Sequence, residues 1–379
     1  MRILALPRYS ALGPSSRVRF YQYFPYLASR GMEIQVAPLL EDDYIIRLFA
    51  RKHPSSIQVA QAYARRLATL LSADSFDLLW IEKELFPWLP KWAEKLLANT
   101  GIPYVVDFDD AVFHRYDLHA NPIIRSMLGK SIDAVMRSAR TVLVGNDYLA
   151  GHASRAGAKK IEYLPSVVDL DRYSIRGNAS TQIRIGWIGS PVTAPYLGLI
   201  RDALEQTSRQ LDLNLVLVGV GKQDPLPGLE KEILPWSEAG EVAAIQSFDV
   251  GIMPLPDEPF ERGKCGYKLI QYMACGLPVI ASPVGANMQI VEQGRTGFLA
   301  SSSADWVQAL VTLGQDAGLR DKVGKAGRAK VEKEYSLQVA APRLFEILST
   351  AVTNGSVTRK NKPSKNLSDK IALDQGLEK

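Results

Sequence analysis

Cysteine is scarce in this sequence, since only Cys265 and Cys275 occur among 379 residues. Two thiols cannot build the disulfide framework of a small secreted domain, and their spacing matches no common metal-binding motif. Long apolar runs are also missing. The run Ile3 to Leu6 is too short for the core of a signal peptide, and no stretch approaches the ~20 apolar residues that cross a bilayer. We therefore expect a cytoplasmic protein whose contact with a membrane is at most peripheral.

A strong excess of either charge sign is absent from the body of the chain. The net charge is +5, but the segment 353–379 alone holds six Lys or Arg against three Asp or Glu. The rest of the chain is therefore close to neutral, which gives no reason to expect nucleic-acid binding. The segment 353–379 is also rich in Lys, Ser and Asn, so we predict that it is disordered.

Short apolar segments alternate with helical patterns through the first half of the chain. Strands are predicted at 2–6, 33–38, 77–81, 103–106 and 141–144. Between them, apolar residues recur at spacings of three and four, and Asn146 is placed to cap the helix after the last of these strands. This alternation predicts a parallel, doubly wound α/β domain over residues 1–173, with ligands at the carboxyl ends of the strands.

Polar side chains gather where these predicted strands end. The candidates for acceptor binding or catalysis at these positions are Ser16, Arg17, Glu82, Asp109, Asp110 and His114. Acidic residues at strand ends often only cap the next helix. The DFDD sequence at 107–110 is harder to explain this way, because three carboxylates within four residues repel one another. Such a cluster needs a nearby cation, a ligand hydroxyl or a raised pKa.

Apolar and basic side chains interleave in the segment from Tyr44 to Lys52. Such a segment could rest on an anionic membrane surface. Alternatively, it could be a helix that packs on its own domain and leaves its arginines in solvent.

A polar stretch near residues 173–182 interrupts the pattern, and strands then alternate with helices again. We predict a second α/β domain over 174–336, with strands at 183–188, 214–218 and 249–253, followed by a helix at 337–352 that packs at the domain junction. Gly189 and Ser190 follow the first of these strands in a tight turn, with Thr193 as the expected helix cap. Two such domains leave a cleft between facing strand ends, which suits a two-substrate reaction that must exclude water.

The stretch from Pro254 to Ile280 concentrates polar groups before a predicted helix. Glu261, Arg262 and Lys264 precede Gly266, where the helix begins, and Lys268 lies in its first turn. A helix N-terminus offers free N–H groups and the positive end of the helix dipole, so an anion is the expected ligand. A lysine there is unfavourable unless an anion is bound, although it could also be an ordinary exposed lysine.

The sequence CGYKLIQYMACGLPVIAS, followed by VGANMQIVEQGRTGFL, resembles the donor-site region of the retaining GT-B glycosyltransferases of family 4, also called group 1. IGWIGSPVTAPYL, LPSVVD and VLVGNDYLA are similar to further landmarks of a bacterial branch of that family. The resemblance implies two Rossmann-like domains facing across a cleft. It also implies a nucleotide-sugar donor, with UDP or GDP as the nucleotide, in the C-terminal domain, and a glycan or lipid-linked acceptor on the N-terminal domain. Retention of configuration and no metal ion are implied as well.

On this resemblance, the diphosphate is expected at Lys268, helped by Lys264, Arg262 and the N–H groups of Gly189 and Ser190. The remaining predicted donor contacts are Thr193, Trp236, Glu261, Gly266 and Gln271. The expected catalytic residues are Asp109, Asp110 and Lys268.

The chain departs from the family pattern at two places. The paired glutamates of the family fall at Gly263 and Gln271, and a histidine of the family is replaced by Asp109. Gln271 could still hydrogen-bond ribose hydroxyls, and Glu258 or Glu261 could replace the first glutamate. Three functions remain open at this point: sugar transfer in the assembly of a surface polysaccharide, a lipid-linked oligosaccharide or a small glycoside, 2-epimerisation of a nucleotide sugar, and binding of a nucleotide sugar without catalysis.

Overall fold

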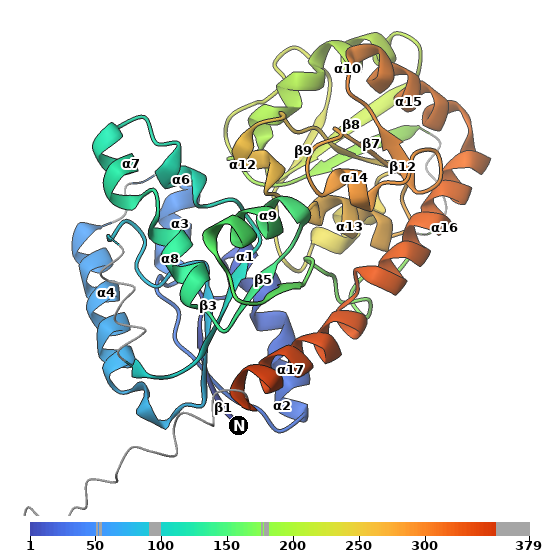
Figure 1. Ribbon diagram of the computed structural model, residues 1–379. Coiled ribbons are helices and arrows are strands. Elements are labelled where there is room, and N and C mark those ends of the chain that lie inside the picture. The colour runs from blue at the N-terminus through green and yellow to red at the C-terminus, as the bar shows by residue number, and fades with distance from the viewer. Residues whose placement is uncertain (51, 53–54, 91–99, 176, 178–181, 354–379) are drawn as a thin grey trace, which may run out of the picture.

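The structure is a computed structural model that describes the chain apart from residues 51, 53–54, 91–99, 176, 178–181 and 354–379. In the described residues, two six-stranded sheets form, and every pair of neighbouring strands is parallel. Helices flank both sheets (Figure 1). The prediction of two doubly wound α/β domains is therefore confirmed.

The first sheet has the strand order β2-β1-β3-β4-β5-β6. Its strands are β1 (Arg2–Leu6), β2 (Glu33–Val36), β3 (Leu78–Glu82), β4 (Tyr104–Phe108), β5 (Thr141–Val144) and β6 (Ile161–Tyr163). The central strands β3, β4 and β5 are buried along their whole length, as expected for a parallel sheet covered on both faces.

Helices and 3-10 turns of the first half connect these strands. They are α1 (Pro14–Arg19), η1 (Tyr21–Tyr23), α2 (Phe24–Ser29), α3 (Asp42–Phe49), α4 (Ser56–Leu71), η2 (Ala73–Ser75), α6 (His114–Asp117), α7 (Pro122–Leu128), α8 (Ser131–Ser138) and α9 (Asp147–Ala156). The predicted cap at Asn146 is confirmed, because its side chain accepts a hydrogen bond from the N–H of Leu149 at the start of α9.

The second sheet has the strand order β12-β11-β10-β7-β8-β9. Its strands are β7 (Ile183–Ile188), β8 (Leu213–Val218), β9 (Glu232–Leu234), β10 (Val250–Met253), β11 (Val279–Ala281) and β12 (Gly297–Leu299). The connecting elements are η3 (Ala194–Ile200), α10 (Arg201–Ser208), α11 (Glu241–Gln246), α12 (Pro259–Arg262), α13 (Tyr267–Ala274), α14 (Asn287–Ile290), α15 (Ser303–Gln315) and α16 (Ala317–Glu334).

Two local predictions from the sequence need correction. Thr193 precedes η3, but its side chain makes no capping hydrogen bond and instead contacts Ser190 in the preceding turn. The three-residue strands β6, β9 and β12 were not expected. All three are edge strands, because β6 ends the first sheet and β9 and β12 are the two ends of the second. Three residues are too few for an alternation to be recognised.

The last described helix, α17 (Leu337–Thr353), follows α16 of the second domain but packs on the first sheet (Figure 1). Its buried side chains Ala340, Leu344 and Leu348 share a core with residues of β1, β3, β4 and α2. The chain crosses between the domains near Val168 and again near Ser336. These two crossings are hydrogen-bonded to each other, because Val168 N–H donates to Tyr335 O and Leu337 N–H donates to Val168 O.

The domain limits at 173/174 and 336/337 remain predictions. The predicted disordered tail lies outside the described residues from 354 onward. In the part of the chain that the structure describes, none of the helices is both long and apolar enough to cross a bilayer.

Because α17 completes the core of the first domain, we expect Leu344→Ala to lower the free energy of unfolding by about 2–5 kcal/mol. The Leu344 side chain is fully buried. The matched control is Val339→Ala on the same helix, where the side chain is 47% exposed, and this change should cost less than about 0.5 kcal/mol. Urea unfolding followed by circular dichroism measures both. Equal effects of the two substitutions would contradict this role of α17.

Candidate active site

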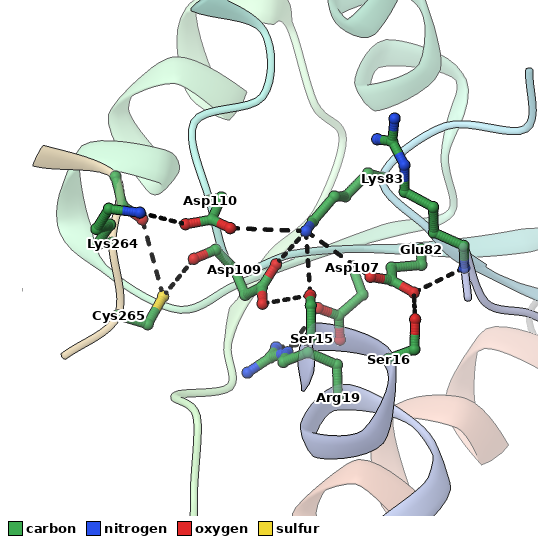
Figure 2. A network of polar contacts seen from close by, with 12 residues as sticks. Ser15, Ser16, Arg19, Glu82, Lys83, Asp107, Asp109, Asp110, Lys264 and Cys265 are labelled. Carbon is green, nitrogen blue, oxygen red and sulfur yellow. Dashed lines mark hydrogen bonds and ion pairs between the residues drawn. The ribbon is translucent and has the colours of Figure 1, made fainter. Parts of the chain in front are cut away.

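Four carboxylates lie at the carboxyl ends of β3 and β4, on Glu82, Asp107, Asp109 and Asp110 (Figure 2). Neighbouring parallel strands end at the same edge of the sheet, so the DFDD sequence and the end of β3 converge there. Asp107 and Glu82 are almost completely buried. Charges buried in this way require partners, and the helix that follows β1 supplies several of them.

Arg19 of α1 pairs with Asp107 through two hydrogen bonds, from Nε to Oδ1 at 2.8 Å and from Nη2 to Oδ2 at 3.0 Å. Both side chains are buried. A third bond, from Arg19 Nη1 to the carbonyl of Leu164 at 2.7 Å, ties the same guanidinium to the start of the first crossing between the domains. The bidentate pair of Arg19 with Asp107 neutralises one of the four carboxylates.

Ser16 and one carboxylate oxygen of Glu82 are hydrogen-bonded to each other. The Ser16 hydroxyl donates to Glu82 Oε2 at 2.5 Å, which also accepts the backbone N–H of Arg8 at 2.7 Å. Both side chains are at most 1% exposed. These two predicted acceptor residues therefore brace α1 against β3, on the inner side of the cluster.

Lys83 is the cation that the DFDD cluster required. Its Nζ lies 2.7 Å from Asp109 Oδ1 and 3.8 Å from Asp110 Oδ2, and it donates to Ser15 Oγ at 3.0 Å (Figure 2). Ser15 in turn donates to Asp109 Oδ2 at 2.5 Å. Sequence analysis did not include Lys83 among the site residues, because nothing in the sequence shows that its side chain points toward the carboxylates.

The backbone at Lys83 is strained. Its φ of 64° lies in the left-handed region, and the Glu84 N–H closes a three-residue turn by donating to Glu82 O at 2.7 Å. A left-handed conformation at a residue with a long side chain costs about 1–3 kcal/mol and often occurs at functional sites. The turn directs the Lys83 ammonium into the carboxylate cluster.

The two adjacent aspartates differ in their protonation. Burial acts to raise the pKa of Asp109, but the positive charges of Lys83 and Arg19 outweigh it and lower this pKa to about 2. For Asp110, burial and then the negative charge of Asp109 raise the pKa, against the opposing effect of Lys264 and Lys83. Asp109 is thus held ionised, while Asp110 gains a proton more readily.

The second domain meets this cluster through the loop before α13. Lys264 Nζ lies 3.8 Å from Asp110 Oδ1, and the Cys265 thiol donates to the carbonyl of Asp109 at 3.1 Å (Figure 2). The Asn146 amide, at the start of α9, donates to the carbonyls of Gly263 and Lys264 at 2.9 and 3.0 Å. The two stretches that carry the most polar groups in the sequence are therefore in direct contact.

Gly263 explains why the first glutamate of the family pattern is missing. A Cβ atom at this position would lie 2.4 Å from Ala111 Cβ and 2.6 Å from Ala111 N. No side chain fits there while the loop at 109–111 contacts the second domain. Carboxylates are instead supplied at this junction by Asp109 and Asp110 of the first domain.

Lys268 lies in the first turn of α13, as predicted, with its Nζ 5.4 Å from the centre of the Trp187 ring. Within the described residues, its ammonium has no hydrogen-bond or ion-pair partner. Burial, and then the positive charge of Lys264, lower the pKa of Lys268 to about 7, although Asp110 opposes this. Gly189 gives it room, because a Cβ there would lie 2.9 Å from Lys268 Cε. An amine in this state favours an anionic ligand.

Three other predicted donor residues, Glu261, Arg262 and Gly266, have the following contacts within the second domain. Tyr196 donates its hydroxyl to Glu261, and Arg262 makes a two-bond pair with the exposed Asp257. Gly266, which caps α13 with a φ of 64°, has no room for a side chain because a Cβ would lie 2.3 Å from Ile290 Cδ1.

Gln271 lies in a buried chain of hydrogen bonds. Its amide donates to Tyr173 Oη at 2.7 Å, and Tyr173 donates to Glu241 Oε1 at 2.9 Å. Trp236 Nε1 donates to the other oxygen of Glu241 at 3.3 Å. The amide nitrogen of Gln271 is thereby engaged within the second domain, and the predicted contact with a ribose remains a prediction.

Arg17 of the first domain contacts the second domain. Its guanidinium lies 5.1 Å from the ring centre of Trp236 and 3.8 Å from Glu238. By contrast, His114 contacts other residues of the first domain. Its Nδ1 lies 2.8 Å from Asp117 Oδ1 and its Nε2 lies 2.7 Å from Tyr148 Oη, so both ring nitrogens have partners. Of these two predicted acceptor residues, only Arg17 lies at the domain boundary.

Comparison with known proteins identifies the second domain. Residues 183–316 match the family model described as glycosyl transferases group 1. The chain is a glycosyltransferase, and its second half is similar to group 1. It is 26% identical over 367 residues to a phosphatidyl-myo-inositol mannosyltransferase of Mycobacterium leprae, which covers 87% of this chain and 91% of the relative.

Two solved structures share the fold of this glycosyltransferase. Anabaena HepE, in complex with UDP and glucose, has a TM-score of 0.68 at 18% identity and covers 92% of this chain and 100% of its own. Sucrose-phosphate synthase from Thermosynechococcus elongatus has a TM-score of 0.70 at 14% identity and covers 93% and 100%. The predicted GT-B fold and the predicted enzyme class are confirmed.

We expect the amine of this glycosyltransferase's Lys268 to titrate near pH 7, well below the ~10.4 of an ordinary lysine, because it is buried beside another cation. NMR of the 13C-methylated lysines measures the titration, and the resonance lost in Lys268→Arg assigns it. In Lys264→Met the midpoint should rise, since the repelling charge is gone. A midpoint above about pH 9.5 in the unmodified sequence would contradict the environment described for Lys268.

Proposed function

We propose that this glycosyltransferase moves a sugar from a nucleoside-diphosphate sugar to a hydroxyl group of a glycan or lipid-linked acceptor, with retention of configuration and without a metal ion. The observation that carries the proposal is the amine of Lys268 in the first turn of α13, which has no hydrogen-bond or ion-pair partner among the described residues and interacts with the charge of Asp110. HepE, with the same fold, was crystallised with UDP and glucose, which supports UDP as one candidate nucleotide and GDP as the alternative.

The leaving diphosphate is the anion that Lys268 would bind. When the bond between sugar and phosphate breaks, negative charge grows on the diphosphate, and groups fixed in place beforehand stabilise it most effectively. Lys268 and Lys264 supply cationic groups. The Gly189 N–H is not free to help them, because it donates to Val218 O at 3.0 Å, and the Ser190 N–H makes only a long contact of 3.4 Å with Thr193 Oγ1. A diphosphate would also raise the pKa of Lys268, so that its binding takes up a proton near neutral pH.

The carboxylates of Asp109 and Asp110 would act on the sugar. Positive charge develops on the sugar ring in the transition state of glycosyl transfer. Asp109 is held as an anion, and Asp110 lies at the domain boundary, 28% exposed and 3.8 Å from Lys264. We assign to this pair the negative charge that faces the anomeric carbon, in place of the carboxylate that has no room at Gly263.

The acceptor would reach the site from a membrane surface. A relative with 26% identity is named for phosphatidyl-myo-inositol, which supports a lipid-linked acceptor here and a role in the assembly of surface glycans or glycolipids. In this chain, α3 exposes Ile46 and Leu48, with exposed fractions of 56% and 43%, on either side of the exposed Arg47. Apolar side chains flanked by a cation suit the interface of an anionic bilayer. Arg51, which was part of this prediction, lies outside the described residues.

The test of transfer is the release of nucleoside diphosphate from UDP- or GDP-sugars that stabilise the protein in a thermal-shift screen. Release that depends on an acceptor, such as phosphatidylinositol vesicles, is expected, with the α or β configuration of the product checked by NMR.

In Lys268→Met, affinity for the nucleoside diphosphate should fall about ten- to a hundredfold. In the unmodified enzyme, it should weaken as the pH rises above about 7, because free Lys268 loses its proton.

The control for Lys268→Met is Lys325→Met on α16, which removes an exposed lysine paired only with Asp321 and should leave the affinity unchanged. Epimer formation without an acceptor, or tight donor binding without turnover across the acceptor panel, would contradict the proposed transfer.

For the membrane, we expect Ile46→Asn combined with Leu48→Asn to weaken binding to vesicles containing anionic lipid about tenfold or more, because each buried apolar side chain contributes about 1.5–3 kcal/mol. Vesicle sedimentation measures the binding. The control is Leu199→Asn in the second domain, whose side chain is equally exposed at 57%. Equal binding of the double variant and the unmodified protein would contradict a role for α3.

A further inference from the structure

We propose that Lys83 is a positioning residue for the transfer reaction, whose ammonium holds Asp109 and Asp110 together as two adjacent negative charges at the junction of the domains. This inference rests on the proposed function, because it assumes that the two aspartates face the sugar. It goes beyond that function by assigning a task to a residue of the first domain outside the predicted site.

The geometry separates Lys83 from an ordinary ion pair. Its Nζ lies within 4 Å of three carboxylates, at 2.7 Å from Asp109, 3.7 Å from Glu82 and 3.8 Å from Asp110. The Ser15 hydroxyl accepts from Nζ and donates to the second oxygen of Asp109, so that both oxygens of Asp109 are fixed. Asp109 is thereby held in one orientation, and only Asp110 remains turned toward the second domain (Figure 2).

The surrounding charges show why this one ammonium matters. The charged and titratable groups around the aspartate pair, together with Ser15, come from every packed element: Glu82 of β3, Lys83 directly after it, Asp107 of β4, Ser15 and Arg19 of α1, Arg115 of α6, Tyr196 of η3, and Lys264, Cys265 and Lys268 of the second domain. Arg19 is already committed to Asp107 through two hydrogen bonds, and Lys264 reaches Asp110 only at 3.8 Å. Lys83 is the cation in hydrogen-bonding contact with the pair.

Removing this ammonium should force one of the two carboxylates to take up a proton. Adjacent carboxylates without a cation share a proton, because two like charges a few ångströms apart oppose full ionisation. Without Lys83, the aspartate pair should therefore take up a proton at a higher pH than in the unmodified protein. As the pH is lowered, turnover that requires both negative charges should be lost at a correspondingly higher pH.

The experiment compares Lys83→Met with Lys83→Arg, which keeps the charge. In Lys83→Met, the acid limb of the pH profile of kcat/KM should move up by about one pH unit or more, while Lys83→Arg should stay close to the unmodified enzyme. The matched control is Lys231→Met, which removes another buried, ion-paired lysine, one that contacts Asp224 and two carbonyls of the second domain. The proposal would be overturned if Lys83→Met lowers kcat/KM at every pH but leaves the acid limb at the same pH as in the unmodified enzyme.

A second measurement needs no turnover. Infrared difference spectra between about pH 5 and about pH 8 report buried carboxyl groups that titrate above the usual range of Asp and Glu. Burial raises the pKa of Asp107 to about 6 and also raises the pKa values of Glu84 and Asp110, so these groups form the background in the unmodified protein. Lys83→Met should add a protonated carboxyl signal, which should disappear when Asp110→Asn is combined with it.

The two measurements separate the inference from the proposed function. An added carboxyl signal in Lys83→Met, in a protein that transfers no sugar to any acceptor, would support Lys83 and contradict the function. If the spectra of Lys83→Met and of the unmodified protein are identical, the proposed role of Lys83 is overturned, whether or not the variant transfers sugar. If Lys83→Met does not fold, Lys83→Gln, which keeps a hydrogen-bond donor without the charge, is expected to give the same signal, and its absence would overturn the proposal.

Discussion

Buried negative charge at the carboxyl edge of the first sheet is the constraint on which the rest of this structure depends. Asp107 and Glu82 are buried where β4 and β3 end, and Asp109 follows within two residues. Burial of ionised carboxylates is costly unless each has a charged or hydrogen-bonded partner. Most partners come from one short helix, α1, which places Ser15, Ser16 and Arg19 over the edge of the sheet. The position of α1 is thus fixed by charge as much as by apolar packing.

The contact between the domains follows from the same cluster. Once α1 and Lys83 have satisfied Asp107, Glu82 and Asp109, the backbone at 109–111 is free to meet the loop before α13. That loop fits because residue 263 has no side chain, and Cys265 and Lys264 then contact Asp109 and Asp110. At this contact, Asp110 of the first domain faces Lys264 of the second, while Arg17 of the first domain faces Glu238 of the second. The contact with Ala111 thus leaves no room for a side chain at residue 263.

Sequence analysis predicted the fold well because central parallel strands are continuous apolar runs. The segments 141–144 and 183–188 were predicted with the same limits as β5 and β7. The edge strands β6, β9 and β12 were not predicted, since three residues carry too little pattern. Within the site, the DFDD sequence required a cation, but its identity as Lys83 depends on a left-handed backbone turn that no periodicity reveals. Gln271 and His114 could not be placed, because their hydrogen-bond partners Tyr173 and Tyr148 are distant in sequence.

The return of α17 to the first domain has a consequence for the order in which the protein can be assembled during synthesis. Domains generally fold as units, in the order in which the ribosome releases them. Here the first sheet lacks part of its apolar cover until residues 337–353 have emerged, after the whole second domain. A nascent chain that stops before this helix would expose the apolar residues of β1 and β3 that α17 covers. The second domain can complete its core first, so the site at the junction forms only in the last step of assembly.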